Sequence, residues 1–320
     1  MTRLVFVHGI GGVRDADHER ATWLEALLVG ARQAGHSRVA AAMERGIGPE
    51  VVFASYADLF TVLGAQTDGD VDLDEQETEI LADLLREAIS IQLTMPHDES
   101  AQRRLKHAAG ELRTEGAGQG VGGLVRQTIN AATTLLGLGP LRKAGQWVTG
   151  KMLVRDLAQV ARYLARAERD ESGSSLDERI RARVSDALGD SPTIVVAHSL
   201  GSIVCLEMLH QFAGTVPLLV TLGSPIAMRT VVLPRLRPAP PRTPESVCRW
   251  LNFWDRDDII AARPRLEADV AANTSGVVPC SSRVDSDGLW VHTATKYLRH
   301  SSVAGPVAES VAASGVEDQR

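Results

Sequence analysis

The sequence predicts an α/β fold, in which a mostly parallel β-sheet is flanked by helices. Short apolar runs rich in Val and Ile recur along the chain. Most are continuous rather than alternating, which is typical of strands buried on both faces of a parallel sheet. Segments with apolar residues at helical spacing separate these runs, as in folds that alternate strands with helices. The candidate strands are residues 4–7, 51–54, 194–197, 218–222 and 247–253.

Two helices are predicted directly after strands of this set. The first has apolar residues at positions 23, 24, 27 and 28, and the second has them at positions 203, 206, 209 and 212. Apolar side chains at spacings of three and four lie on one face of an α-helix. The pattern therefore places a helix after strand 4–7 and another after strand 194–197.

A long helical segment interrupts the alternation of strands and helices. Residues 80–88 and 153–164 carry aliphatic side chains at helical spacing, with the Gly-rich residues 116–123 between them. We expect residues 61–177 to form a helical insertion, or cap, that precedes strand 194–197. Residues 1–60 and 178–306 are then the α/β core. The small and polar residues 307–320 are expected to form a flexible tail.

An acidic run lies near the start of this insertion. Asp68, Asp70, Asp72 and Glu79 have the spacing of ligands in an EF-hand calcium loop, but Leu73 stands where that loop requires Gly. The run is instead predicted to be an acidic helix start, where carboxylates complement the helix dipole. No metal is expected here or elsewhere.

Composition and charge exclude several classes of protein. The 320 residues include 34 Lys and Arg against 40 Asp and Glu, which gives a net charge of −6. This charge does not indicate the basic surface that proteins use to bind nucleic acid. The three Cys residues have no paired spacing, which argues against a disulfide framework or a zinc site. No secretory signal and no apolar stretch of ~18 residues is visible. We expect a soluble cytoplasmic protein.

The stretch 193–202, TIVVAHSLGS, places a Ser at the end of a predicted strand. A β-branched run leads into His198, Ser199 and Gly201, and helical spacing follows. This is the pattern of a nucleophile elbow, a sharp strand-to-helix turn that presents a reactive Ser. The usual G-x-S-x-G motif has Ala197 in place of its first Gly. Ser is also a common helix N-cap, so the motif by itself leaves capping and catalysis equally open.

The stretch 4–12, LVFVHGIGG, is a strand followed by glycines. Glycines bring backbone N–H groups close to a ligand without obstruction by side chains. A dinucleotide fingerprint would begin at Gly9 and Gly11 but would need a third Gly where Arg14 stands. An oxyanion hole instead needs two N–H donors aimed at a developing negative charge. The N–H groups of Ile10 and Leu200 are the natural pair.

These two motifs, VFVHGIGG and VVAHSLGS, resemble those of the α/β-hydrolase superfamily, on its lipase and esterase side. The resemblance covers residues 3–60 and 190–300, whereas no motif covers the helical insertion. It implies oxyanion hydrogen bonds from Ile10 and Leu200. It also implies that the catalytic residues follow one another along the chain in the order Ser, acid, His.

Candidates for the acid follow Ser199 at the end of strand 247–253. The family often shows N-x-x-D-x-x-D-x-V/I at this point, which matches Asn252, Asp255, Asp258 and Ile260. The triad acid must lie just past the strand end, turned back toward the His. This match favours Asp258 as the acid, and Asp255 is the alternative.

Candidates for the base follow the acidic loop. Of the nine His residues, His292 and His300 lie beyond it, and His292 stands just before a predicted helix, as the base of the family commonly does. His292 is therefore the predicted base. His292 would take the Ser199 proton while Asp258 fixes its tautomer. No metal or cofactor is needed for this chemistry.

The predicted function is a serine hydrolase that cleaves a carboxylic ester of a small molecule or lipid through an acyl-enzyme. Thioester and amide substrates use the same triad and stay open. The apolar helical insertion has three candidate roles, which are a pocket for a fatty acyl chain, contact with a membrane surface, and plain packing of the cap on the body. The last is favoured. The alternative function is a non-catalytic α/β-hydrolase fold used for binding or interaction.

Overall fold

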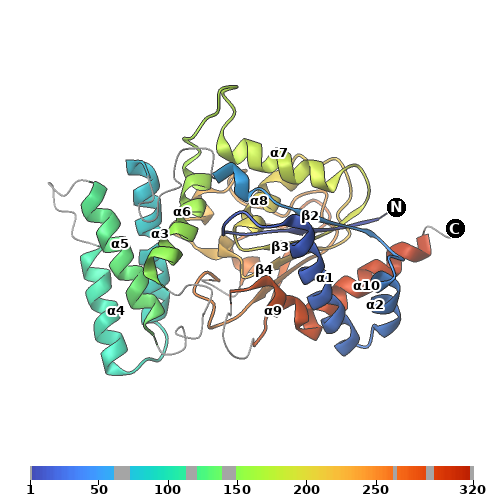
Figure 1. Ribbon diagram of the computed structural model, residues 1–320, viewed down its shortest axis with the longest axis horizontal. Coiled ribbons are helices and arrows are strands. Elements are labelled where there is room, and N and C mark those ends of the chain that lie inside the picture. The colour runs from blue at the N-terminus through green and yellow to red at the C-terminus, as the bar shows by residue number, and fades with distance from the viewer. Residues whose placement is uncertain are drawn as a thin grey trace.

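A six-stranded sheet forms the centre of the molecule (Figure 1). The computed structural model describes residues 2–60, 73–112, 121–138, 149–261, 265–285 and 292–317. The strand order is β2-β1-β3-β4-β5-β6, and each adjacent pair is parallel. Helices flank the sheet, so the predicted α/β class is confirmed. The strands are β1 (Arg3–Val7), β2 (Glu50–Ala54), β3 (Thr193–His198), β4 (Leu219–Leu222), β5 (Trp250–Trp254) and β6 (Pro279–Arg283).

The first four strands lie within one residue of their predicted positions, and the remaining two differ. β5 begins at Trp250 rather than at 247, because Val247 forms only an isolated bridge with Val216 and its N–H closes a turn by donating to Pro244 O. β6 was not predicted. Its sequence, PCSSR, has no apolar pattern, and its pairing partner is β5 at the edge of the sheet. A strand of this kind is held by its neighbour's backbone rather than by buried side chains.

Alternate side chains of the strands face two separate cores. Val5 and Val7 point into a core shared with α7 and α8, whereas Leu4 and Phe6 point into a core shared with α1, α9 and α10. Strands covered on both faces in this way read as continuous apolar runs. The helices that cover the sheet are α1 (Ala16–Gln33), α2 (Ser37–Glu44), α7 (Leu176–Leu188), α8 (Leu200–Leu209), α9 (Ala294–Arg299) and α10 (Ser301–Glu317).

Four helices form a separate group beside the sheet, with α6 nearest to it (Figure 1). They are α3 (Glu75–Leu93), α4 (Glu99–Glu111), α5 (Val121–Leu136) and α6 (Gly150–Ala165). We call them the helical unit. α3 begins in the acidic run, where the side chain of Asp74 accepts from Glu77 N–H and that of Glu77 accepts from Asp74 N–H. Asp68, Asp70 and Asp72 lie outside the described residues.

The helical unit shares its core with the body of the protein. Leu81 and Leu157 belong to the same buried apolar cluster as Val7 of β1 and Leu200 of α8. Burial of aliphatic side chains contributes about 1.5–3 kcal/mol each, so this shared core ties the unit firmly to the sheet. A polar contact adds to it, since the buried carboxylate of Glu87 on α3 accepts from the backbone N–H of Arg229 and Thr230.

The flexible tail predicted from residue 307 is wrong for residues 307–317, which continue α10. Val303, Val307 and Val311 recur at intervals of four, and all are buried in the core beneath α1. The intervening Ala, Ser and Gly residues have the composition of a polar tail. The helical spacing of the three valines is the signal that outweighs it.

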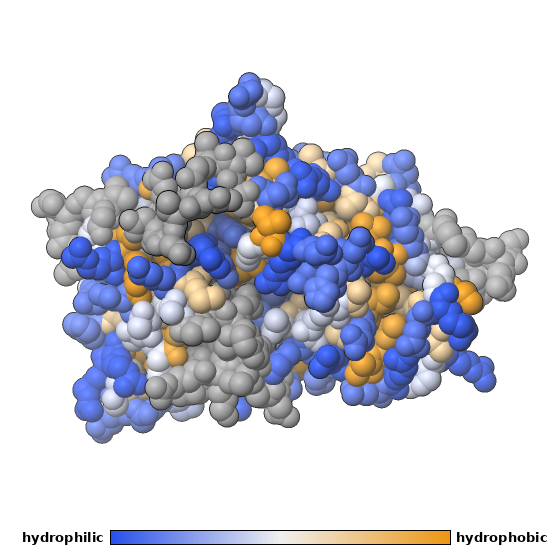
Figure 2. Space-filling model, in the orientation of Figure 1, coloured by the Kyte–Doolittle hydropathy of each residue, from blue (hydrophilic) through white to orange (hydrophobic). Residues whose placement is uncertain are grey.

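The described surface is mainly hydrophilic on the face seen in Figure 2, where apolar residues gather in smaller patches between polar ones. Within the described ranges, no helix combines the length and the apolar character needed to cross a membrane. The two apolar cores described above hold most of the large aliphatic side chains.

Candidate active site

The candidate site lies at the carboxyl ends of β1 and β3, in the middle of the sheet. Chain order reverses here, because β2 lies on one side of β1 and β3 lies on the other. In open parallel sheets such a switch point leaves a crevice outside the strand ends, and ligands bind there. Gly9 and Ile10 follow β1, and Ser199 follows β3. The topology thus brings the two sequence motifs together.

Ser199 occupies a strained turn between β3 and α8. Its backbone has φ 52° and ψ −127°, a conformation that side chains rarely adopt and that costs about 1–3 kcal/mol. The Ser199 N–H donates to Leu222 O at 3.0 Å, and the Ser202 hydroxyl donates to Ser199 O at 2.6 Å. The Ser224 hydroxyl in turn lies 2.6 Å from that of Ser202. These hydrogen bonds keep the Ser199 backbone in its strained conformation, and Ser224 contributes to the turn through Ser202.

Two glycines allow this turn to form against the loop after β1. A Cβ on Gly201 would lie 2.4 Å from His8 O, and one on Gly9 would lie 2.6 Å from the Cβ of Ser199. Both distances are shorter than real Cβ contacts, so these positions require Gly. Ala197, which departs from the usual motif, is fully buried in β3 in register with Val7 and Thr221. Its methyl group is accommodated, and the strained turn forms beside it.

Ser199, His292 and Asp258 form a continuous chain of hydrogen bonds. His292 Nε2 lies 3.0 Å from Ser199 Oγ, and His292 Nδ1 lies 2.8 Å from each carboxylate oxygen of Asp258. An ionised carboxylate only accepts, so Nδ1 carries the proton and Nε2 is free to accept from the Ser hydroxyl. The structure thus brings together the three residues that the sequence predicted as nucleophile, base and acid.

The carboxylate of Asp258 is fixed on both oxygens. Oδ1 accepts from Ile260 N–H at 2.9 Å, and Oδ2 accepts from the Tyr297 hydroxyl at 2.8 Å. Burial and the neighbouring carboxylate raise the pKa of Tyr297, which keeps its hydroxyl protonated and able to donate. Asp255, the alternative acid, accepts from Asp257 N–H through Oδ1 and from Asp258 N–H through its carbonyl. Asp255 therefore shapes the turn that presents Asp258.

The three linked side chains are buried. Ser199 is 0%, His292 1% and Asp258 4% exposed. Charge–dipole interactions are stronger in such a water-poor site than in solvent.

The two predicted oxyanion donors, the backbone N–H groups of Ile10 and Leu200, lie in the loop after β1 and directly after Ser199, respectively. Leu200 is the first residue of α8, and the N–H groups of a helix's first turn have no partner within the helix. Ile10 follows Gly9 in the loop after β1. The next N–H of that loop, on Gly11, donates to the side chain of Gln159 at 3.0 Å. That bond engages Gly11 N–H and makes Ile10 N–H the adjacent candidate donor.

Two further His residues flank the nucleophile turn. The ring of His8 packs edge-on against Phe53 and Tyr56, and burial lowers its pKa to about 3. His198 packs against the proposed base, with its ring 4.6 Å from that of His292. Burial and then the nearby His292 lower the pKa of His198.

No protein-family model, curated protein or solved structure matches this chain. The case for a function therefore rests on the geometry of the site and on the chemistry of its residues.

Sequence reasoning missed three contributors to this site. Gln159 and Tyr297 carried no motif, because each acts on a residue that the fold alone brings near. Ser224 carries no motif of its own, although its position next to Gly223, just after a predicted strand, is visible in the sequence. Among the described residues, no three His, Cys, Asp or Glu side chains gather as a metal site.

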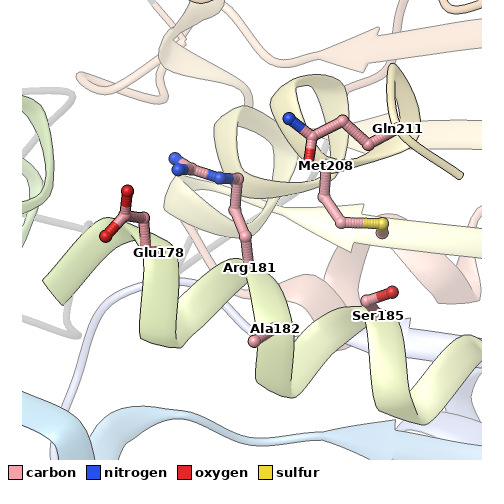
Figure 3. A pocket seen from close by; sticks show the side chains of 6 residues that line it. All are labelled: Glu178, Arg181, Ala182, Ser185, Met208 and Gln211. Atoms are coloured by element: carbon pink, nitrogen blue, oxygen red, sulfur yellow. The ribbon is translucent and has the colours of Figure 1, made fainter. Parts of the chain in front are cut away.

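A separate pocket of about 310 Å³ lies between α7 and the end of α8 (Figure 3). Arg181 and Ser185 line it from α7, and Met208 and Gln211 line it from α8 and the residues after it. Met208 is nine residues along the chain from Ser199, or about 14 Å along a helix axis. Arg181 is engaged in ion pairs with Asp177 and Glu207. The pocket is thus distinct from the site at the strand ends.

Proposed function

We propose that this protein is a serine hydrolase that cleaves a carboxylic ester, with Ser199 as nucleophile, His292 as base and Asp258 as acid. The observation that carries the proposal is the unbroken hydrogen-bond chain from Ser199 Oγ through the imidazole to the carboxylate. The strained backbone of Ser199 supports it, because such strain persists where the surrounding structure enforces it and is concentrated at functional sites.

The reaction begins with attack of Ser199 Oγ on the ester carbonyl carbon. His292 Nε2 takes the hydroxyl proton as the new C–O bond forms, and Asp258 stabilises the imidazolium. The carbonyl oxygen becomes an oxyanion, which the N–H groups of Ile10 and Leu200 stabilise. Each such donor contributes about 3 kcal/mol to transition-state stabilisation.

Collapse of the tetrahedral intermediate expels the alcohol. The imidazolium returns its proton to the alcohol oxygen, and the acyl group stays on Ser199 as an ester. A water molecule then gives a proton to His292 and attacks the acyl carbon, which releases the carboxylic acid and restores the Ser199 hydroxyl. All steps use proton transfers among groups of this chain, substrate and water.

The surroundings favour an ester with an apolar acyl group. Ile10 and Leu200, the two proposed oxyanion donors, belong to the same apolar cluster as Phe60 and the buried faces of α3 and α6. An ester with an apolar acyl group is therefore the first substrate class to test, because the buried side chains around the proposed oxyanion donors are apolar.

The test is hydrolysis of p-nitrophenyl esters of graded acyl chain length. We expect the wild type to cleave at least one member of the series and Ser199→Ala to lower kcat by a factor of about 10⁴ or more. Ser185→Ala is the matched control, because it removes a hydroxyl from the separate pocket between α7 and α8. It should keep wild-type activity.

The proposal fails if folded wild type cleaves none of these esters, or if Ser199→Ala cleaves them as fast as wild type does. The first outcome, extended to thioester and amide substrates, favours the alternative function as a non-catalytic binding protein. Equal activity of Ser199→Ala would instead place the chemistry at another residue.

A further inference from the structure

Gln159 connects the helical unit to the loop that carries the proposed oxyanion donor. Its side-chain oxygen accepts from Gly11 N–H at 3.0 Å, and its side-chain nitrogen donates to Gly11 O at 2.9 Å. The two residues are 148 positions apart in the chain. Both bonds together fix the amide orientation, since only one arrangement of its oxygen and nitrogen satisfies them.

The loop between β1 and α1 needs such a constraint. Its residues 9–12 read Gly-Ile-Gly-Gly, and glycines lose more conformational freedom on ordering than other residues. Gly11 also has φ 137°, a backbone conformation open to Gly and strained for other residues. Without an external contact this peptide has many accessible orientations. Two hydrogen bonds to one side chain select a single orientation of the Gly11 backbone, directly beside Ile10.

The helix that carries Gln159 is itself well anchored. α6 packs against α3 and α5, and its residues Leu153 and Leu157 are buried. One turn after Gln159, the Arg162 guanidinium donates to Phe60 O at 2.9 Å and is paired with Glu168. One face of α6 therefore holds the loop after β1 through Gln159 and the segment after β2 through Arg162.

We propose that Gln159 is a positioning residue that orients the oxyanion loop and makes the helical unit part of the catalytic apparatus. This inference rests on the proposed function, because the loop has an oxyanion to bind only if Ser199 attacks a carbonyl. By engaging the N–H of Gly11, Gln159 leaves that of Ile10 to face the reacting carbonyl. The helical unit is then required for the chemical step itself, in addition to any contact with the acyl group.

The first experiment compares Gln159→Leu with wild type and with Gln92→Leu. Leu keeps a side chain of similar size and removes both hydrogen bonds. Gln92 is the matched control, since it is a buried Gln of α3 whose side chain bonds to His97 within the helical unit. We expect Gln159→Leu to lower kcat by a factor of about 10 to 100 with KM within about twofold of wild type, as for a misplaced oxyanion donor. Gln92→Leu should keep kcat.

The second experiment uses Gln159→Glu and a pH series. An ionised carboxylate can accept from Gly11 N–H but cannot donate to Gly11 O, and its charge opposes a nearby oxyanion. A protonated carboxyl can do both, as the amide does. The kcat of Gln159→Glu divided by that of wild type at the same pH should therefore rise as pH falls through the range in which the introduced carboxyl gains its proton. A purely structural contact would leave this ratio flat.

A phenylboronic acid inhibitor separates failure of this inference from failure of the proposed function. It adds to a catalytic Ser as a tetrahedral anion, so its affinity should fall in Gln159→Leu by the same factor as kcat. If wild type cleaves esters and binds the inhibitor while Gln159→Leu matches wild type in both, the role of Gln159 is refuted and the hydrolase remains. An equal loss in Gln92→Leu would also refute it. If wild type neither cleaves esters nor binds the inhibitor, the proposed function falls and this inference falls with it.

Discussion

Gly223→Ala tests the Asp258–His292 contact without removing either residue. Gly223 follows β4, and its N–H donates to Phe253 O at 3.0 Å. A Cβ at this position would lie 2.7 Å from Asp258 Oδ2 and 3.2 Å from His292 Nδ1. The substitution therefore adds one methyl group against the pair that holds the proposed base.

The size of the effect follows from two contributions. Gly223 has φ 52°, and an Ala in this left-handed region costs about 1–2 kcal/mol of stability. The second contribution is steric, because ordinary contact begins at 3.4 Å and Asp258 Oδ2 must move by the difference of 0.7 Å. That movement stretches its 2.8 Å bonds to His292 Nδ1 and from the Tyr297 hydroxyl. A misplacement near 1 Å costs about 100-fold in rate, so we expect kcat to fall by about that factor.

Gly276→Ala separates the two contributions. Gly276 also has a left-handed backbone, with φ 78°, but apart from its chain neighbours no atom of the described residues lies within 4 Å of the position that a Cβ would take there. It should lose similar stability in urea unfolding and keep wild-type kcat for a p-nitrophenyl ester. The reasoning would be refuted if folded Gly223→Ala kept kcat within about threefold of Gly276→Ala.

Three further outcomes are expected. Tyr297→Phe removes a hydrogen bond to the proposed acid, so kcat should fall about 10-fold with KM unchanged in steady-state assays, and an unchanged kcat would remove Tyr297 from the site. Asp258→Asn should lower kcat far more than Asp255→Asn does, and the reverse order would make Asp255 the acid. The pKa of the His8 imidazole is about 3 in the folded protein and 6.5 in the unfolded chain. Between these pH values the unfolded chain binds a proton at His8 that the folded protein does not bind, so the free energy of unfolding falls as the pH drops below 6.5. In urea unfolding, the free energy of unfolding of His8→Leu should fall by about 2 kcal/mol less than that of wild type between pH 6.5 and pH 5. An equal fall in both proteins would contradict a buried neutral imidazole at position 8.

Local patterns were sufficient to predict most of the sheet. β1, β3 and β4 are buried and mostly apolar, and the edge strand β2 carries an apolar run from Val51 to Ala54, so all four were visible in the sequence. β6 was not predicted because its residues show no apolar pattern. Its backbone pairs with β5 at the sheet edge. The last turns of α10 escaped notice because Ala, Ser and Gly outnumber the three buried valines.

Motifs predicted the residues that the structure brings together at the candidate site, because their chemistry restricts residue type. Ser199, Asp258 and His292 each stood at the end of a strand or before a helix, and their order along the chain was a recognisable pattern. The contacts that hold them were invisible. Gln159 meets Gly11 across 148 positions, and Tyr297 reaches Asp258 across 39. Such pairs depend on the packing of helices, which local spacing does not specify.

The measurement that tests the central claim most directly is mass spectrometry after treatment with a fluorophosphonate, which phosphonylates an activated Ser. The account predicts that wild type gains the mass of one adduct, that peptide mapping places it on Ser199, and that Ser199→Ala gains none. It also predicts that the fluorophosphonate labels His292→Ala far more slowly than wild type, because the Ser199 hydroxyl of that variant has no base beside it. Folded wild type that gains no adduct, or Ser199→Ala that gains the same adduct as wild type, would contradict the assignment of Ser199 as the nucleophile.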